Sequence, residues 1–269
     1  MGVAGACVIA AAAATAYCAV AARAIPAEDY AAIFGDKYAG AERFVRQNRW
    51  IADTLQLSAD DTRVAVAVVF PEIVRFNAIE DDIQVRGLKV LYVQYGRAYA
   101  NFSVGRFQMK PSFAEQLEAD YRDLFTDSER REAGLPAFES GDTPGLREQR
   151  VRRLDDTAWQ VRYLRLFMLA MGKRYATAAA SGTEDRVRFY ATAYNAGYQL
   201  GEAALRRTMT RRRFHIALVL PSATYSYAEV ALFFFRSQAA HDIGSPGPGA
   251  SSTEPSAGSS RRPRHPSSG

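Results

Sequence analysis

Cysteine is scarce in this chain of 269 residues, because its two cysteines, Cys7 and Cys18, both fall within the first 22 residues. Beyond them the sequence has no thiol, which excludes a disulfide framework and a cysteine nucleophile from that part. The three histidines show no spacing typical of metal ligands, and no phosphate-binding loop or dinucleotide fingerprint occurs. We therefore expect neither a metal site nor a cofactor.

Lysine is also scarce, with only four residues among 34 basic ones. An excess of arginine and alanine is typical of a GC-rich genome rather than of a selected basic surface. The net charge of +5 would still favour an anionic polymer as partner. We interpret the clusters Arg206–Arg207 and Arg211–Arg213 as solvated ends of helices, with acidic lipid or cell-wall groups as possible contacts, and expect no nucleic-acid partner.

Charged side chains are absent from residues 1–22, a segment rich in alanine that ends in small residues. This pattern resembles a secretory signal peptide, so we assign residues 1–24 to a signal peptide and expect export to the periplasm or cell envelope. About 20 apolar residues can also span a bilayer. An uncleaved anchor that associates the protein with a membrane therefore remains an alternative, as do a lipoprotein and an ordinary buried helix.

Helical periodicity dominates the rest of the chain, which predicts a mostly α fold with one domain over residues 25–242. The tail, 243–269, is rich in Ser, Pro, Gly and Arg and is expected to be disordered. Residues 126–147 read as a surface loop. The expected helices cover residues 39–50, 58–70, 81–99, 111–124, 154–180 with a break at Gly172, 187–205 and 225–240.

One apolar run, Val64–Phe70, matches either a buried strand or a buried helix. Ser58 and Asp61 form a capping pattern in front of it, which favours a helix that ends near Pro71. Glu72 follows directly and has apolar neighbours on both sides. An apolar site raises the pKa of a carboxylic acid, as a general acid for glycoside cleavage requires.

Local sequence alone leaves other interpretations of Glu72 open. It could be a partly exposed residue at the end of a helix, or it could pair with Arg75. The nearby acidic residues Glu80, Asp81 and Asp82 could supply a second carboxylate, but such a cluster is typical of a solvated surface. We assign them no role.

Three short motifs occur in a fixed order along the chain: Pro71–Asn77 contains Glu72, Gly105–Ala114 begins with Gly-Arg-Phe-Gln, and Ala193–Gly197 reads Ala-Tyr-Asn-Ala-Gly. Together they resemble the three motifs of the lytic transglycosylase and goose-type lysozyme superfamily. The resemblance spans roughly residues 58–205. It implies a lysozyme-like helical domain that acts on peptidoglycan glycan strands.

In this family a single glutamate acts as general acid and then as base, so the resemblance gives both roles to Glu72. The second step takes a proton from the C6 hydroxyl and closes a 1,6-anhydro ring without water. Gln108 and the backbone around Gly105 would hold the N-acetyl sugar. Tyr194 would hydrogen-bond at the acid, and Asn195 would brace the loop.

The chain departs from the family pattern at three places. Ile73 stands where the family has a serine, Arg106–Phe107 stands where it has Leu-Met, and the gap between Glu72 and Gly105 is longer and contains an extra predicted helix. Two alternatives to a lytic transglycosylase therefore stay open. One is a non-catalytic peptidoglycan-binding protein on the same fold, and the other is a hydrolytic goose-type lysozyme.

Overall fold

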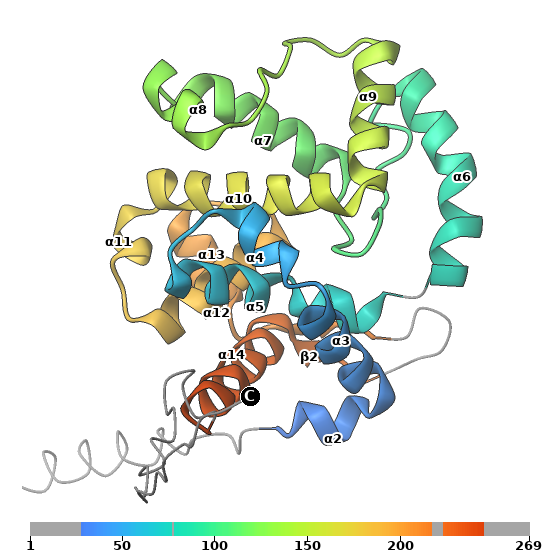
Figure 1. The fold of residues 1–269 in the computed structure, drawn as a ribbon. Coiled ribbons are helices and arrows are strands. Elements are labelled where there is room, and N and C mark those ends of the chain that lie inside the picture. Colours follow the sequence, from blue (N-terminus) through green and yellow to red (C-terminus); the bar gives the residue numbers. More distant parts are fainter. Residues whose placement is uncertain (1–27, 77, 217–222, 245–269) are drawn as a thin grey trace, which may run out of the picture.

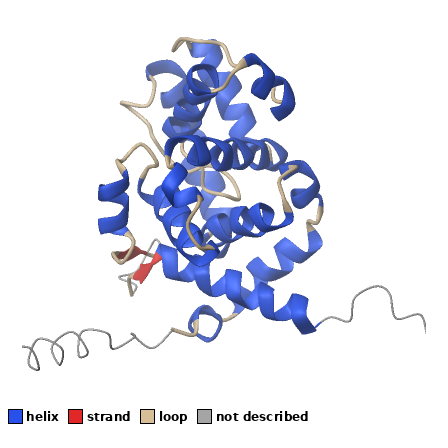
Figure 2. Cartoon of the chain, turned by 90° about the vertical axis from the view of Figure 1, so that its left-hand side faces the viewer, coloured by secondary structure: helices blue, strands red, loops and turns tan. Residues whose placement is uncertain are grey.

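The computed structural model describes residues 28–76, 78–216 and 223–244, and for residues 78–85 and 239–244 it describes the backbone only. This part of the chain is mostly helical, as the periodicity predicted (Figure 1). Its named strands, β1 (Arg212–Phe214) and β2 (Tyr225–Ser226), form an antiparallel pair at one edge of the molecule (Figure 2). The predicted signal peptide lies outside the described residues, as does the predicted disordered tail apart from its first two residues, 243–244, which are the helical end of α14 (Tyr227–Gly244). Among the helices described, none has the length and apolar character needed to cross a bilayer.

The helices follow one another along the chain in three groups. The first group is α2 (Tyr30–Phe34), α3 (Asp36–Gln47), α4 (Trp50–Leu55), α5 (Ala59–Arg75) and α6 (Ala78–Tyr95). The second group is α7 (Pro111–Leu124), α8 (Asp127–Ala133), α9 (Pro144–Asp155) and α10 (Thr157–Arg174). The last group is α11 (Ala176–Ala179), α12 (Thr183–Ala196), α13 (Glu202–Thr208) and α14 (Tyr227–Gly244). The longer connections come before α7, α9 and α14.

Helices α5, α12 and α14 pack against one another and form the centre of the hydrophobic core. Ser58 caps α5 by accepting a hydrogen bond from the backbone N–H of Asp61, as expected. From Val64 onward nearly every residue of α5 is buried, and the rings of Phe70 and Phe234 stack with their centroids 3.7 Å apart. Because buried side chains surround α5, tertiary packing stabilises this helix more than the helix propensity of its valine-rich sequence does.

The expected end of this helix near Pro71 is wrong, because α5 continues through Pro71 to Arg75. A proline inside a helix removes one backbone hydrogen bond and costs about 3 kcal/mol. Here the flanking residues Phe70, Ile73 and Val74 are buried, and the transfer of such side chains from water contributes about 1.5–3 kcal/mol each. Packing therefore outweighs the local penalty, and Glu72 lies within the last turn of the helix.

Helices α7, α8 and α9 lie above α10, which runs across the middle of the molecule, and α6 runs down the side next to α9 (Figure 1). Part of the expected surface loop over 126–147 is helical: α8 begins at Asp127, and its N-cap Thr126 forms a capping box with Glu129. The expected long helix over 154–180 is divided at Asp156 and Tyr175, and not at Gly172. The first break is explained by the side chain of Asp156, which caps α10 by accepting a hydrogen bond from the backbone N–H of Ala158.

Candidate active site

A cavity of about 440 Å³ brings together residues from all three sequence motifs. Glu72 comes from the end of α5, Gln108 from the loop before α7, and Tyr194 and Asn195 from the end of α12. These segments are far apart in sequence. The size is within the range of small-molecule sites, which are usually about 300–1,000 Å³. Other residues that line it are Arg75, Arg97, Asn101, Ser103, Met109, Lys110, Ser112, Phe113, Gln116, Ala196, Gly197, Tyr198 and Gln199.

Glu72 is buried, with 4% of its surface exposed, and it is one of the residues that line the cavity. Its surroundings are not purely apolar, because Nη2 of Arg75 lies 2.7 Å from Oε2 of Glu72. This ion pair favours the ionised carboxyl, whereas burial and the C-terminal end of a helix dipole favour the neutral acid. The pairing with Arg75 was one of the alternatives that the sequence left open.

Tyr194 links the third motif to the second. Its hydroxyl donates a hydrogen bond of 2.7 Å to the carbonyl oxygen of Phe107. The sequence analysis expected this hydroxyl to bond to the acid Glu72, and its proton is instead donated to the hairpin loop. Burial raises the pKa of Tyr194 well above its ordinary value, and the negative charge of Glu72 raises it further. The Tyr194 hydroxyl therefore stays protonated beside Glu72.

The Gly-Arg-Phe-Gln motif forms the tip of a tight hairpin. Val104 and Met109 pair across it through two backbone hydrogen bonds of 2.9 and 3.1 Å. Gly105 has φ = 69° and Gln108 has φ = 49°, both in the left-handed region. Glycine adopts that region without steric cost, which explains its position here. The side chain of Gln108 donates from Nε2 to the Gly105 carbonyl oxygen at 2.9 Å, so the amide and the turn are fixed together.

Gln160 of α10, which the sequence analysis missed, holds this hairpin through side-chain hydrogen bonds to its backbone. Its Oε1 accepts from the backbone N–H of Phe107 at 2.8 Å, and its Nε2 donates to the carbonyl oxygens of Val104 and Leu154 at 2.9 and 2.6 Å. It is fully buried. Gln160 lies on the same helix face as Leu164 and Phe167, so a polar residue within an apolar stripe was the available signal.

Arg106, one of the departures from the family pattern, has a structural role. Its guanidinium lies 4.1 Å from the ring centroid of Phe76 and 4.6 Å from that of Phe44. Cation–π contacts of this kind contribute about 0.5–2 kcal/mol. Arg106 thereby connects the hairpin to α3 and to the C-cap residue of α5, four positions beyond Glu72.

Asn195 lines the cavity. The sequence analysis expected it to brace the loop, and it does not. Its side chain is exposed, and it makes no hydrogen bond within the described part of the chain. The end of α12 is instead shaped by Gly197, which has φ = 104° and whose N–H donates to the carbonyl oxygen of Ala193. Asn195 is thus available to a ligand.

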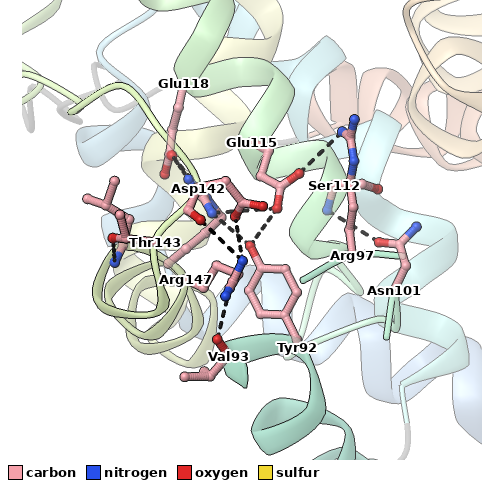
Figure 3. A network of polar contacts seen from close by, with 12 residues as sticks. Tyr92, Val93, Arg97, Asn101, Ser112, Glu115, Glu118, Asp142, Thr143 and Arg147 are labelled. Carbon is pink, nitrogen blue, oxygen red and sulfur yellow. Dashed lines mark hydrogen bonds and ion pairs between the residues drawn. The ribbon is translucent and has the colours of Figure 1, made fainter. Parts of the chain in front are cut away.

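On the α7 side, the cavity wall rests on a polar network (Figure 3). Arg97 forms an ion pair of 3.2 Å with Glu115, and Glu115 accepts a hydrogen bond of 2.7 Å from the hydroxyl of Tyr92. Asn101 accepts from the backbone N–H of Ser112 at 3.3 Å. The network holds Arg97 and Asn101 at the cavity from the segment that follows α6.

Another part of the wall depends on Tyr198 and Asp120. The Tyr198 hydroxyl donates to Oδ2 of Asp120 at 2.9 Å, and Nε of Arg174 donates to the same oxygen at 2.8 Å. Burial alone would raise the pKa of Asp120, but the hydrogen bonds from Arg174 and Tyr198 outweigh it and lower that pKa. Asp120 is therefore an ionised anchor beneath the cavity.

The described residues contain no group of three or more His, Cys, Asp or Glu side chains placed to hold a metal ion. Side chains of the acidic cluster Glu80, Asp81 and Asp82 lie outside the described residues. Comparisons of the chain with protein-family models, curated proteins and solved structures find no match. The arrangement of the cavity is therefore what can support a function.

Proposed function

We propose that this protein is an exported, lytic-transglycosylase-like enzyme that cleaves peptidoglycan glycan strands. The observation that carries the proposal is that Glu72, Gln108 and Tyr194, from three motifs far apart in sequence, line one cavity. The spacing of the motifs along the chain does not require this. A buried acid beside hydrogen-bonding groups is what glycoside cleavage needs.

In the proposed reaction, Glu72 protonates the oxygen that leaves between N-acetylmuramic acid and N-acetylglucosamine. The bond from C1 to that oxygen breaks, and the N-acetyl group of the sugar stabilises the cationic C1. Glu72 then takes the proton from the C6 hydroxyl, and O6 closes on C1. The two products together have the composition of the substrate, so no water is consumed.

The other residues of the cavity would bind and orient the sugar. The hairpin of Gly105 and Gln108 is rigid, because Gln160 fixes its backbone through two hydrogen bonds. Its amide and carbonyl groups suit the N-acetyl substituent of the sugar. Asn195, which is exposed in the cavity, supplies a further donor and acceptor. Rigid placement of this kind lowers the entropic cost of reaching the reactive geometry.

Arg75 is the specific observation that favours the second candidate, a peptidoglycan-binding protein without activity. An arginine 2.7 Å from the acid stabilises its charged form, which cannot donate a proton. For the enzyme, substrate binding must exclude water and separate or weaken this pair. A hydrolytic lysozyme-like route is the third candidate and uses the same acid.

Mass analysis of digested sacculi separates these candidates. The wild-type protein should release anhydro-muropeptides, each one water lighter than a hydrolytic product. The variant Glu72→Gln should lower the rate by about 10²–10⁴-fold, the usual contribution of general acid–base catalysis. Glu148→Gln is the matched control, because this exposed residue of α9 lies outside the cavity and should leave the rate unchanged.

Each alternative has its own outcome. Equal release by the wild type and Glu72→Gln would remove Glu72 from the reaction. Products with the added water would assign hydrolysis. Co-sedimentation with sacculi and no product from the wild type would assign the binding protein.

A further inference from the structure

A second cavity, of about 330 Å³, adjoins the first on the side of α13 and β1. The two cavities share Asn195 and Ala196 in their walls. The two cavities therefore border the same residues at the end of α12. Its other lining residues are Thr192, Leu200, Thr208, Met209, Arg211, Arg213, Tyr227 and Ala228.

Two exposed guanidinium groups, those of Arg211 and Arg213, give this cavity its charge. Neither forms an ion pair or a side-chain hydrogen bond within the described residues. Their neighbours in the same basic cluster differ: Arg212 pairs with Glu28 at 3.0 Å, and Arg206 pairs with Asp185 and Glu202. Arg206 and Arg212 are thus neutralised by surface acids, Arg207 lies outside the cavity lining, and Arg211 and Arg213 remain available at the cavity.

The hydroxyl protons of the wall are already committed elsewhere. Thr192 donates to the carbonyl oxygen of Arg188, Thr208 to that of Ala204, and Tyr227 to that of Val68, at 2.8, 2.8 and 2.9 Å. The free donors are therefore the two guanidiniums and the amide of Asn195. Leu200, Met209 and Ala228 complete the wall with apolar surface.

We propose that this second cavity binds the carboxylate groups of the peptide stems that branch from the glycan strand. The inference rests on the proposed function, because the glycan must lie in the first cavity for a stem to reach Arg211 and Arg213. Guanidinium groups match carboxylates in charge and geometry, and the apolar wall suits short aliphatic side chains. The site would then favour strands that carry peptides over bare strands.

Binding measurements in the Glu72→Gln background test this inference without turnover. The probes are soluble glycan strands with intact stems and the same strands after enzymatic removal of the stems. Arg211→Ala/Arg213→Ala should weaken binding of stem-bearing strands about tenfold and leave stem-free strands unaffected. Arg43→Ala/Arg49→Ala is the matched control, because it removes the same charge from exposed positions that line neither cavity.

The outcomes separate the inference from the proposed function. If stem-free strands bind and the stems add nothing, the inference is wrong and the proposed function stands. If neither strand binds and the wild type releases no product, the proposed function itself fails. If the control pair weakens binding of stem-bearing strands equally, long-range charge explains the effect and the inference is wrong. If Arg211→Ala/Arg213→Ala weakens binding to phosphatidylglycerol vesicles but not to strands, the two arginines bind a membrane surface and the inference is overturned.

Discussion

Two glutamates of this protein are buried to the same degree but in different surroundings. Glu72 in α5 is 4% exposed and Glu118 in α7 is 3% exposed. Glu118 accepts hydrogen bonds from Arg150 at 2.6 and 3.0 Å and from the hydroxyl of Tyr163 at 2.5 Å, and it pairs with Arg153 at 3.3 Å. It does not line the candidate site.

The comparison separates two kinds of buried acid, one enclosed by counter-charges and one at a cavity. The charge of Glu118 is balanced by Arg150 and Arg153 of α9, and Figure 3 shows Glu118 within the network that supports the cavity wall. Burial would lower the pKa of Arg150, but the charge of Glu118 outweighs it and raises that pKa. Glu72 differs because it lines a cavity large enough for a ligand.

The same substitution, Glu→Gln, should have very different effects on stability at these two positions, and its effect at Glu118 is the largest that we expect. Glu118→Gln should lower the free energy of unfolding by about 3–5 kcal/mol, because it leaves Arg150 and Arg153 buried without their counter-charge. Glu72→Gln should change it by less than about 1 kcal/mol, since the amide keeps an acceptor near Arg75 and removes a negative charge from the C-terminal end of a helix. Urea unfolding measures both, and equal losses would break the comparison.

Gly105→Ala tests whether the hairpin beside Glu72 is as tightly constrained as the network around Glu118. A Cβ at this position would lie 1.9 Å from Nε2 of Gln160, and φ is in the left-handed region. We expect a loss of about 2–4 kcal/mol from strain and displacement together. Gly145→Ala is the control, because an added Cβ there meets open space. Similar melting temperatures for the two variants would contradict the constraint.

Asp120 offers a test through pH. Because its folded-state pKa lies below that of the unfolded chain, its contribution to stability is complete above about pH 4 and is lost as the pH falls through the folded value. Asp120→Asn should cost about 1–3 kcal/mol at pH 7 and progressively less in acid. Melting temperatures from pH 7 to pH 2 measure this, and a constant difference between the two proteins would show that the charge is not responsible.

The smallest effect is expected for Tyr194→Phe. It removes the hydrogen bond to the Phe107 carbonyl and should cost about 1–1.5 kcal/mol. If the tyrosine only positions the hairpin, the Michaelis constant for stem-bearing strands should rise more than the turnover number falls. A collapse of turnover with an unchanged Michaelis constant would instead give Tyr194 a role in the chemistry.

Sequence reasoning predicted the helical class, the cap at Ser58 and the burial of the helix that carries Glu72. These features follow from local patterns of apolar and polar residues. The prediction that α5 ends near Pro71 was wrong, because local propensity does not include the packing of α12 and α14 around this helix. Helix α8 was missed because its charged sequence is short, although the Thr126 and Glu129 pattern of a capping box is readable.

The residues that line the cavity were partly predictable through motif order, whereas their partners were not. Gln160 lies 53 residues from Phe107, and no local pattern indicates which backbone groups a distant amide will meet. The destination of the Tyr194 hydroxyl depends in the same way on where the hairpin lies. Residues that support a site through long-range hydrogen bonds emerge only from the three-dimensional arrangement.

The three hydrogen bonds of Gln160 have a consequence for the motions of the protein. A Gly-containing turn would ordinarily exchange its amide protons with solvent quickly. The Phe107 amide, however, donates to a fully buried side chain. In deuterium oxide it should exchange as slowly as amides of the central helices, through opening of the core rather than local fraying. The floor of the cavity would then keep its shape over the time in which surface turns open and close many times.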